Sequence, residues 1–143
     1  MSDAFWAYGS QIQAGDGAVS EAFTSVSEVK KLTPPKLSRA VIDVTHMLSP
    51  NGYKEFIPGW RDGGEMNYEA NWLPTDATQD AVTGLHASFN DNLVHNWRLL
   101  IPDVLYISFS GFITAHEPDT PLEDGAKIAG TIKISGEPTV TLL

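Results

Sequence analysis

The side chains of this chain that are capable of metal or acid–base chemistry show no spacing that would bring them together into a familiar site. The sequence contains no cysteine, which excludes disulfide frameworks, thiolate nucleophiles and sulfur-ligated metal sites. A metal site needs several ligands that converge, and the histidines stand at no helical or strand spacing from one another. We therefore predict no bound metal, and structural or solvent-exposed roles for the four histidines: His46, His86, His95 and His116.

Two carboxylates, Glu65 and Glu69, lie on one face of a predicted strand, and glycoside hydrolysis uses such a pair. Residues four apart on a strand are about 13 Å apart at about 3.3 Å per residue, which is too far for the retaining or the inverting mechanism. The sequence also has no nucleophile elbow, phosphate-binding loop or dinucleotide-binding glycine pattern. It therefore predicts no catalytic residue, no cofactor and no enzyme.

The composition indicates one globular domain over residues 1–143. A chain of this length with 42% hydrophobic residues can bury a core of its own. It has no apolar run approaching about 18 residues and no basic segment followed by an apolar core at its start, so we expect neither a membrane span nor Sec export. The formal net charge of −9 argues against sequence-specific contact with nucleic acid, which relies on lysine and arginine at the phosphates. The charge is compatible with DNA as a cargo that does not bind to the protein.

Period-two alternation dominates the sequence and predicts a mainly β fold. The clearest strand is 65–72, in which apolar and polar side chains alternate strictly. An Asp-Gly pair in the turn at 14–17 predicts an antiparallel hairpin around it. Together the strands predict an antiparallel β-sandwich or open barrel. The remaining strands are expected at residues 9–13, 19–32, 38–45, 94–101, 104–115 and 127–135.

Local patterns also predict how two of the elements are buried. The strand at 38–45 places Ala40, Ile42 and Val44 on one face, which predicts that this face is buried and the other solvated. One helix, expected at residues 77–90, flanks the sheet, because its apolar residues recur at spacings of three and four and form a single stripe.

An apolar stretch predicted to be irregular, residues 46–64, is the most informative feature of the sequence. Loops longer than about 12 to 15 residues are uncommon in compact domains. A lid over an active site should carry catalytic side chains, and the polar residues of this stretch form no catalytic arrangement. The stretch therefore either caps the chain's own core or docks onto another subunit, where burial contributes about 25 cal/mol per Å² of apolar surface. The candidate contact residues are Met47, Leu48, Tyr53, Phe56, Ile57 and Trp60.

Charged side chains form two groups of opposite sign. The groups could meet across a repeated interface, or each could be a solvated loop, since an exposed ion pair contributes only about 0 to 1 kcal/mol. The open edges of the sheet also allow two interpretations. Pro34, Pro35 and Pro138 could block pairing with another chain, or the edges could serve assembly. The basic group is Lys30, Lys31, Lys36 and Arg39, and the acidic group is Glu117, Asp119, Glu123 and Asp124.

The aromatic residues leave a second class of function open. Tryptophan rings can stack on sugars, as they do in carbohydrate-binding β-sandwiches. The residues that could form such a platform are Trp6, Trp60, Trp72 and Trp97, together with the tyrosines.

Three motifs in a fixed order give the sequence a family resemblance. They are SRAVIDVTH at 38–46, IPGWRDGGE at 57–65 and NWLP at 71–74 before the helix. Over about residues 19–135 the chain resembles the tail tube (major tail) protein family of long-tailed bacteriophages with non-contractile tails, typified by that of phage lambda. The additional C-terminal immunoglobulin-like domain of some members is not found, so no surface-decorating role is expected.

The resemblance implies a virion structural protein of the tail, assembled in the host cytoplasm, and no enzyme. Its fold would be a β-sandwich with one flanking helix, assembled as hexameric rings that stack into a tube around a β-barrel lumen. The tube would form around a tape-measure protein, join tail terminator and tail-tip proteins, and conduct double-stranded DNA as non-specific cargo. Stretch 46–64 would contact the adjacent ring. The nearest alternative is the tube protein of a contractile tail or a bacterial secretion system.

Overall fold

The computed structural model describes residues 4–6, 8–18 and 20–143. In these residues the chain forms nine β-strands, one α-helix and one short 3₁₀ helix. The strands are β1 (Gln11–Gly15), β2 (Phe23–Ser25), β3 (Val29–Thr33), β4 (Ser38–Asp43), β5 (Phe56–Asp62), β6 (Glu65–Asn71), β7 (His95–Ile101), β8 (Leu105–Asp119) and β9 (Lys127–Leu142). The helices are η1 (Pro50–Gly52) and α1 (Leu85–Asn90).

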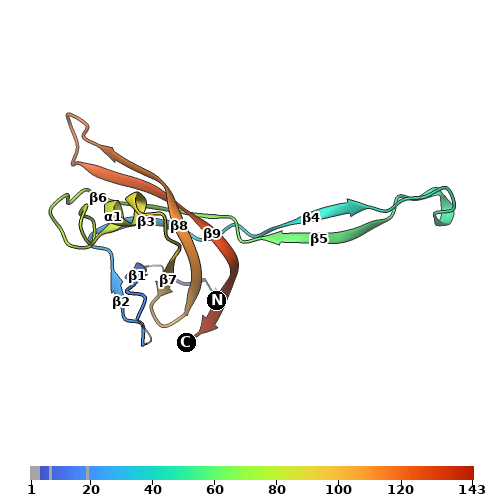
Figure 1. The fold of residues 1–143 in the computed structure, drawn as a ribbon, viewed down its shortest axis with the longest axis horizontal. Helices are drawn as coiled ribbons and strands as arrows, with labels where there is room; N and C mark the ends of the chain where they lie inside the picture. The colour runs from blue at the N-terminus through green and yellow to red at the C-terminus, as the bar shows by residue number, and fades with distance from the viewer. Residues whose placement is uncertain (1–3, 7, 19) are drawn as a thin grey trace.

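Seven strands form one antiparallel sheet in the order β2-β1-β7-β8-β9-β6-β3, and β4 and β5 form a separate two-stranded sheet (Figure 1). The larger sheet curls, so that β1 contacts β3 although the two strands are not hydrogen-bonded neighbours. The prediction of a mainly β, antiparallel protein is confirmed. The sheet is open, because no ladder in the described residues joins β2 to β3 and closes it into a barrel.

Alternation along β6 places its apolar side chains inside the curled sheet. Met66, Tyr68 and Ala70 are buried, whereas Glu65 and Asn67 face solvent, as the sequence pattern predicts. Burial of apolar surface at about 25 cal/mol per Å² makes this the register in which the strand is stable. The same alternation on the neighbouring strands completes one core, whose most deeply buried members include Ile12, Trp97, Leu99, Ile128 and Ile132.

The core leaves no room for a side chain at Gly130. This residue lies on β9 between Tyr68 on β6 and His116 on β8 in the ladder. The ring of Tyr68 lies over it, and a β-carbon added at Gly130 would overlap that ring. Burial also raises the pKa of the Tyr68 hydroxyl, which stays protonated. Close approach of an aromatic ring to the backbone therefore accounts for glycine within this strand.

Stacked histidine rings hold α1 against β8. The rings of His86 on α1 and His116 on β8 lie 5.0 Å apart between centroids and 25° from parallel. Phe89 on α1 also stacks on His116, at 6.3 Å. Burial first, and the charge of His86 second, lower the pKa of His116, because both disfavour the imidazolium form. The helix is therefore packed against a histidine that favours its neutral state.

The helix is shorter than the predicted 77–90, because residues 77–84 form turns instead. The Asp80 carboxylate accepts hydrogen bonds from the backbone N–H groups of residues 82–84, at 2.7 to 3.1 Å. Such local side-chain bonds compete with helical backbone bonds. Gly84 is itself extended, with φ of −104° and ψ of −156°, and α1 begins only after it. The helix prediction is wrong for the first half of the segment.

Gln79 fixes this turn segment to the sheet. Its side chain is buried, and its Oε1 accepts the N–H of Leu73 at 3.0 Å. Its Nε2 donates to the carbonyl oxygens of Ser27 at 3.1 Å and Asn71 at 3.0 Å. A buried amide with all of these bonds satisfied stabilises the fold, whereas an unsatisfied one would cost about 1 to 3 kcal/mol.

The predicted strand at 19–32 is in fact two strands, β2 and β3, at opposite edges of the sheet; residue 19 itself lies outside the described residues. Val26 separates them and donates its N–H to Ile12 O at 2.9 Å. Glu28 then adopts a φ of +53°, which is uncommon for a residue other than glycine and turns the chain. The turn was predicted at 14–17, but residues 14 and 15 belong to β1 and Gly15 pairs with Phe23, so the connection to β2 is longer than predicted.

Strands β8 and β9 are longer than predicted, with 15 and 16 residues, and they form one long hairpin that runs past the rest of the sheet (Figure 1). The C-terminal end of β9 lies at the opposite end of the body. No helix in the described part of the chain has the length and apolar composition needed to cross a membrane.

Candidate assembly surface

The stretch predicted as irregular, residues 46–64, contains most of the turn and the second strand of a β-hairpin. β4 and β5 pair antiparallel and project from the body as a narrow arm with η1 at its far end (Figure 1). We call residues 38–62 the arm and its turn, residues 44–55, the tip. The irregular-loop prediction is therefore wrong for residues 56–62, which form β5.

A bulge in β5 explains why the sequence pattern did not predict this strand. The register shifts opposite Ala40, so that Gly59 and Trp60 together face that one residue. A β-carbon at Gly59 would lie 3.2 Å from the carbonyl oxygen of Ala40, which is tight, so glycine suits this position. Bulges bend a strand and redirect its side chains. Pro58 and Gly59 are residue types depleted in strands, so the sequence pattern did not indicate β5. Among the described strands, β5 pairs with β4 alone.

The arm stands clear of the body. Every residue of β4 is exposed, including Ala40 and Ile42, and Val44 is exposed just beyond it. The prediction that this face is buried is therefore wrong, because no layer formed by the described residues covers it. The main contact of the arm's strands with the body is that of β5 with β9. An isolated two-stranded hairpin is at best marginally stable in water, so we infer that another molecule covers the arm.

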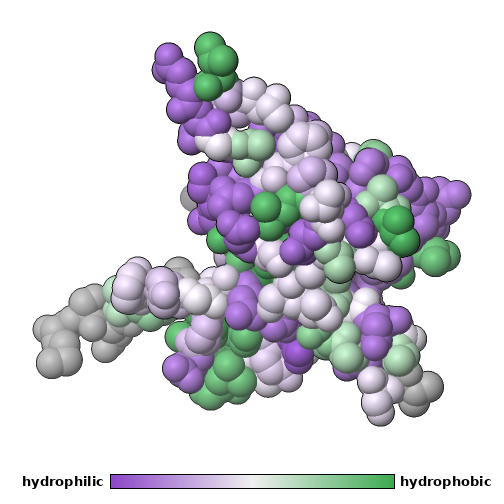
Figure 2. All heavy atoms as spheres, turned by 90° about the vertical axis from the view of Figure 1, so that its left-hand side faces the viewer, coloured by the Kyte–Doolittle hydropathy of each residue, from purple (hydrophilic) through white to green (hydrophobic). Residues whose placement is uncertain are grey.

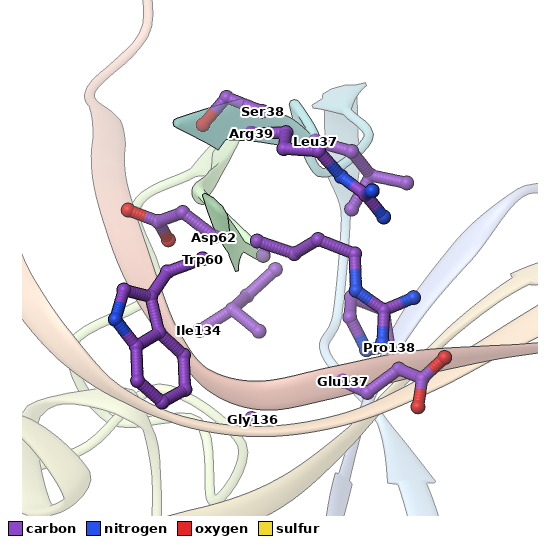
Figure 3. Close-up of a pocket in the computed structure, with 11 residues that line it drawn as sticks. Leu37, Ser38, Arg39, Trp60, Asp62, Ile134, Gly136, Glu137 and Pro138 are labelled. Carbon is purple, nitrogen blue, oxygen red and sulfur yellow. The ribbon is translucent and has the colours of Figure 1, made fainter. Parts of the chain in front are cut away.

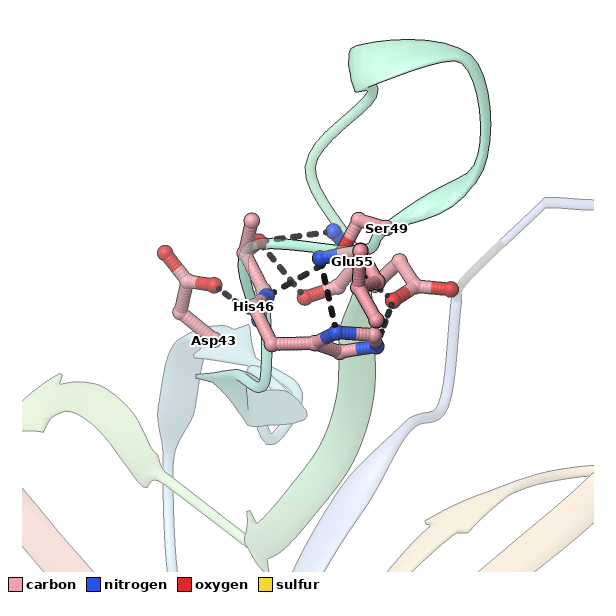
Figure 4. Close-up of polar contacts among 6 residues, drawn as sticks. Asp43, His46, Ser49 and Glu55 are labelled. Atoms are coloured by element: carbon pink, nitrogen blue, oxygen red, sulfur yellow. Dashed lines mark hydrogen bonds and ion pairs between the residues drawn. The ribbon is translucent and has the colours of Figure 1, made fainter.

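Polar bonds within the tip satisfy its backbone and hold its shape (Figure 4). The Ser49 hydroxyl donates to Glu55 Oε2 at 2.7 Å and accepts the N–H of His46 at 3.0 Å. His46 Nε2 lies 3.3 Å from the same carboxylate, and its Nδ1 accepts the N–H of Leu48 at 3.2 Å. The N–H of Glu55 donates to Thr45 Oγ1 at 2.8 Å. Side-chain acceptors therefore satisfy the backbone N–H groups of His46, Leu48 and Glu55 within the tip.

Two further features define the turn at the tip. Asn51 and Gly52 adopt φ values of +56° and +73°, a region in which asparagine and glycine are the most tolerant residues. Asp43 accepts the N–H of Thr45 at 2.9 Å (Figure 4). Hydrogen bonds from the Thr45 hydroxyl first and from its N–H second lower the pKa of Asp43, so these bonds are charge-assisted at neutral pH.

All six apolar residues singled out from the sequence lie on the arm and are exposed. At the tip, Met47 is 100% exposed, Leu48 85% and Tyr53 75%, and nearer the body Trp60 is 90% exposed. The alternative that this stretch caps the chain's own core is therefore excluded. On the side of the body opposite the arm, apolar side chains form small separate patches among hydrophilic ones (Figure 2). Sequence reasoning missed further exposed apolar residues on or beside the arm: Leu37, Val41, Ile42 and Val44.

A groove of about 540 Å³ lies where the arm meets β9, and we call it the root groove (Figure 3). Leu37, Ile134 and Pro138 give it apolar walls, and Trp60 borders it. Its charged lining residues are Arg39, Arg61, Asp62 and Glu137.

Bonds from Asp62 connect the arm to the body beside this groove. Its Oδ1 accepts the N–H of Gly64 at 2.8 Å and lies 3.0 Å from Lys133 Nζ on β9. The N–H of Gly64 first, and Lys133 second, lower the pKa of the Asp62 carboxyl. A β-carbon at Gly63 would meet the side chain of Ile134, so this glycine lets the arm approach the sheet closely.

Open strand edges are a second surface. β2 and β3 are the outer strands of the curled sheet. β9 pairs with β6 only over residues 127–133, and β8 pairs with β7 only over 105–111. In the described residues no strand pairs with the remaining outer edges of this long hairpin. Pro34 and Pro35 follow β3 rather than lying within it, so they do not block its edge.

The two charged groups lie partly side by side within one subunit. Lys31 is opposite Glu69, and Glu69 and Glu117 are both opposite Ala129, so these side chains share one row across the sheet and line a hollow of about 280 Å³. The pKa of Asp124 is lowered mainly by a hydrogen bond from the N–H of Gly125. Lys127 lowers this pKa further, and the charge of Lys30 contributes least. Arg39, by contrast, lies at the start of the arm, and Lys36 lies just before it.

A profile of the lambda phage tail tube protein family matches residues 6–141, which is nearly the whole sequence. The chain belongs to this family. It is a structural protein of the virion tail tube, and the resemblance noted from the sequence motifs is confirmed. The sequence matches none of the curated proteins.

Solved tail and injection tubes share the fold of this tail tube protein. The tail of an empty gene transfer agent particle, refined with C6 symmetry, aligns with a TM-score of 0.73 and 20% identity over 92% of this chain and 94% of that chain. The virion of a native gene transfer agent aligns with 0.75 and 18% identity over 96% and 99%. A sheath–tube complex of the extracellular contractile injection system PVC aligns with 0.71 and 12% identity over 100% and 95%. The fold is thus common to the tails of gene transfer agent particles and to the tube of a contractile injection system.

Other predicted chemistry is rearranged by the fold. Trp97 is buried and donates its Nε1–H to Gly111 O at 3.1 Å, so it cannot join a sugar-stacking platform with Trp60 on the distant arm. His86 and His116, which have no regular spacing in the sequence, are brought together by packing. No group of three or more potential metal ligands occurs among the described residues.

Proposed function

We propose that this tail tube protein polymerises as stacked rings of six copies, and that the arm of each copy makes the contact between rings. The exposed apolar arm is the observation that carries the proposal. Its tip is held by internal hydrogen bonds, whereas its large apolar side chains are exposed in the isolated subunit. The C6 symmetry of the gene transfer agent tail that shares this fold supports the ring of six.

Energetics favour such a contact. Burying a leucine or methionine side chain fully contributes about 1.5 to 3 kcal/mol. Met47 and Leu48 are almost completely exposed in the isolated subunit, so nearly all of that stabilisation is available to an intermolecular contact. A ring that docks as a unit makes the same contact once per copy, and repetition gives an avidity far greater than the single affinity.

Lateral contacts within a ring are proposed for the open strand edges. Adjacent subunits would pair their outer strands, and the curled sheets would join into one closed β-barrel around the lumen. Closure removes free edges, which otherwise invite uncontrolled aggregation. The long β8–β9 hairpin, whose two ends extend past β7 and β6 respectively, provides unpaired backbone for this role.

The proposed cargo of the tube is double-stranded DNA. The net charge of −9 on each copy sums around a ring, and an acidic or neutral lumen repels phosphate, so DNA slides instead of adsorbing. The proposed partners are a tape-measure protein inside the growing tube, tail-tip proteins at one end and a tail terminator at the other. The role we propose is conduction of the genome into the host, not catalysis.

The charged groups are proposed to guide lateral assembly. Lys30 and Lys31 lie on the edge strand β3, and acidic residues lie where β8 meets β9. Reversal of both lysine charges should slow assembly and increase its dependence on salt, because attraction across an exposed interface is screened within a Debye length of about 8 to 10 Å. Assembly at an unchanged rate and salt dependence would refute this role.

Electron microscopy of purified protein, alone and with a tail-initiation complex, tests the proposal as a whole. We expect tubes of stacked six-membered rings, with faster growth when the complex is present. Featureless monomer under both conditions would overturn the proposed polymerisation. A parallel measurement of thermal unfolding shows whether the subunit itself is folded in each sample.

A further inference from the structure

We propose that the root groove is the receptor for the tip of another copy's arm, so that the contact between rings is tip into root groove. The proposal rests on the proposed function, since it names the partner surface of the arm. The tip side chains that would enter are Met47, Leu48 and Tyr53, and the walls that would receive them include Leu37, Ile134 and Pro138.

Geometry makes this contact intermolecular and directional. The root groove and the tip lie at opposite ends of one extended hairpin. From Phe56 to Asp62 the chain advances six residues along β5, or about 20 Å at about 3.3 Å per residue, and the tip lies beyond Phe56. A tip therefore cannot reach the root groove of its own chain. Two complementary but different surfaces on one subunit make a head-to-tail contact, which repeats from copy to copy and builds a filament.

The chemistry of the two surfaces matches. The root groove has apolar walls with charged side chains among its lining, and the tip carries three large apolar side chains held on a bonded turn. Glu137 in the groove and Lys54 beside Tyr53 have opposite charges, and neither has an ion-pair partner among the described residues. Their pairing would orient the tip as its apolar side chains enter.

A second copy fits this groove better than a small ligand does. Ligand pockets combine apolar walls with a few buried polar groups that fix the orientation of the ligand. Here the charged lining residues Arg39 and Glu137 are exposed, and Asp62 is already bonded to Gly64 and Lys133. Trp60, which borders the groove, is itself 90% exposed and belongs to the arm, so the groove continues into the apolar surface that needs cover.

Cysteine cross-linking tests the assignment, because the chain has no cysteine of its own. The variant Lys54→Cys with Glu137→Cys places one thiol beside the tip and one in the root groove, and it leaves every apolar residue of the contact in place. The matched control is Lys54→Cys with Val82→Cys, since Val82 is also exposed but lies on the turn before α1. Tubes of each variant are treated with an oxidant or a bifunctional thiol reagent and run on denaturing gels without reductant.

We expect a ladder of covalent multimers from the 54–137 pair and several-fold less product from the control pair. Tubes co-assembled from the two single-cysteine variants should yield dimers and no ladder, and this mixture also serves if the double variant assembles poorly. Tubes without the 54–137 link, or with equal links in the control, overturn the groove assignment alone. Product that stops at a dimer in the double variant indicates reciprocal exchange of arms and overturns the head-to-tail contact. Absence of tubes from the unaltered protein overturns the proposed function instead.

Discussion

Replacing Leu48 with serine should weaken assembly without unfolding the subunit. Leu48 is 85% exposed in the isolated chain, so the change removes almost no packing, and the free energy of unfolding should stay within about 0.5 kcal/mol of the parent value. In the proposed contact between rings the same side chain would be buried, and burial of a leucine contributes about 1.5 to 3 kcal/mol. With about 2 kcal/mol lost, at about 1.4 kcal/mol for each factor of ten, the critical concentration for assembly should rise about 30-fold.

Two measurements on one preparation separate the two effects. Sedimentation of tubes from a dilution series gives the critical concentration, and urea unfolding of unassembled protein gives the stability of the subunit. Val82→Ser is the matched control, because Val82 is 81% exposed and lies away from the arm. It should change neither quantity.

Particular results would refute the reasoning. An unchanged critical concentration for Leu48→Ser would show that this side chain stays exposed in the tube. An equal rise for Val82→Ser would show that any loss of surface hydrophobicity weakens assembly. A fall of more than about 1 kcal/mol in the stability of the unassembled subunit would mean that Leu48 packs within its own chain, contrary to its exposure.

Three further changes test other parts of the molecule. Trp60→Ser combined with Phe56→Ser should leave the melting temperature nearly unchanged, because both side chains face solvent. The double change should shorten or abolish tubes in electron micrographs. Tubes of normal length would contradict a docking role. Gly130→Ala should destabilise the subunit by about 1 to 3 kcal/mol in urea unfolding, because the new methyl group meets the ring of Tyr68, and parental stability would show that the sheet relaxes freely. His116→Gln should reduce the loss of stability on acidification. Burial first, and a neighbouring charged histidine second, hold the pKa of His116 below 6.5. The stability that neutral His116 contributes is therefore present above the pKa of the unfolded state and is lost as pH falls through the pKa of the folded state. Superimposable profiles of unfolding free energy from about pH 7 to about pH 5 would argue against this.

Local pattern predicted the body of the fold well where one face of a strand packs on the core. In β6, Met66, Tyr68 and Ala70 alternate with polar residues and are buried, because side chains on a strand point to opposite faces with a period of two. Where the pattern failed, a specific interaction was stronger. Asp80 bonds to the backbone that a longer helix would have used, and Glu28 turns the chain between two strands that had the composition of one.

The sequence alone determined three things: motifs indicated the family of this tail tube protein, period-two alternation indicated its mainly antiparallel β fold, and an apolar stretch indicated the six apolar residues of the arm. Only the tertiary structure decided that these residues belong to a hairpin standing clear of the body, with a groove at its base. The physical reason is that alternation reports that a strand face needs cover but not which molecule covers it. Ala40, Ile42 and Val44 have the spacing of a face packed on a core, and in the part of the chain that the structure describes no layer lies over them.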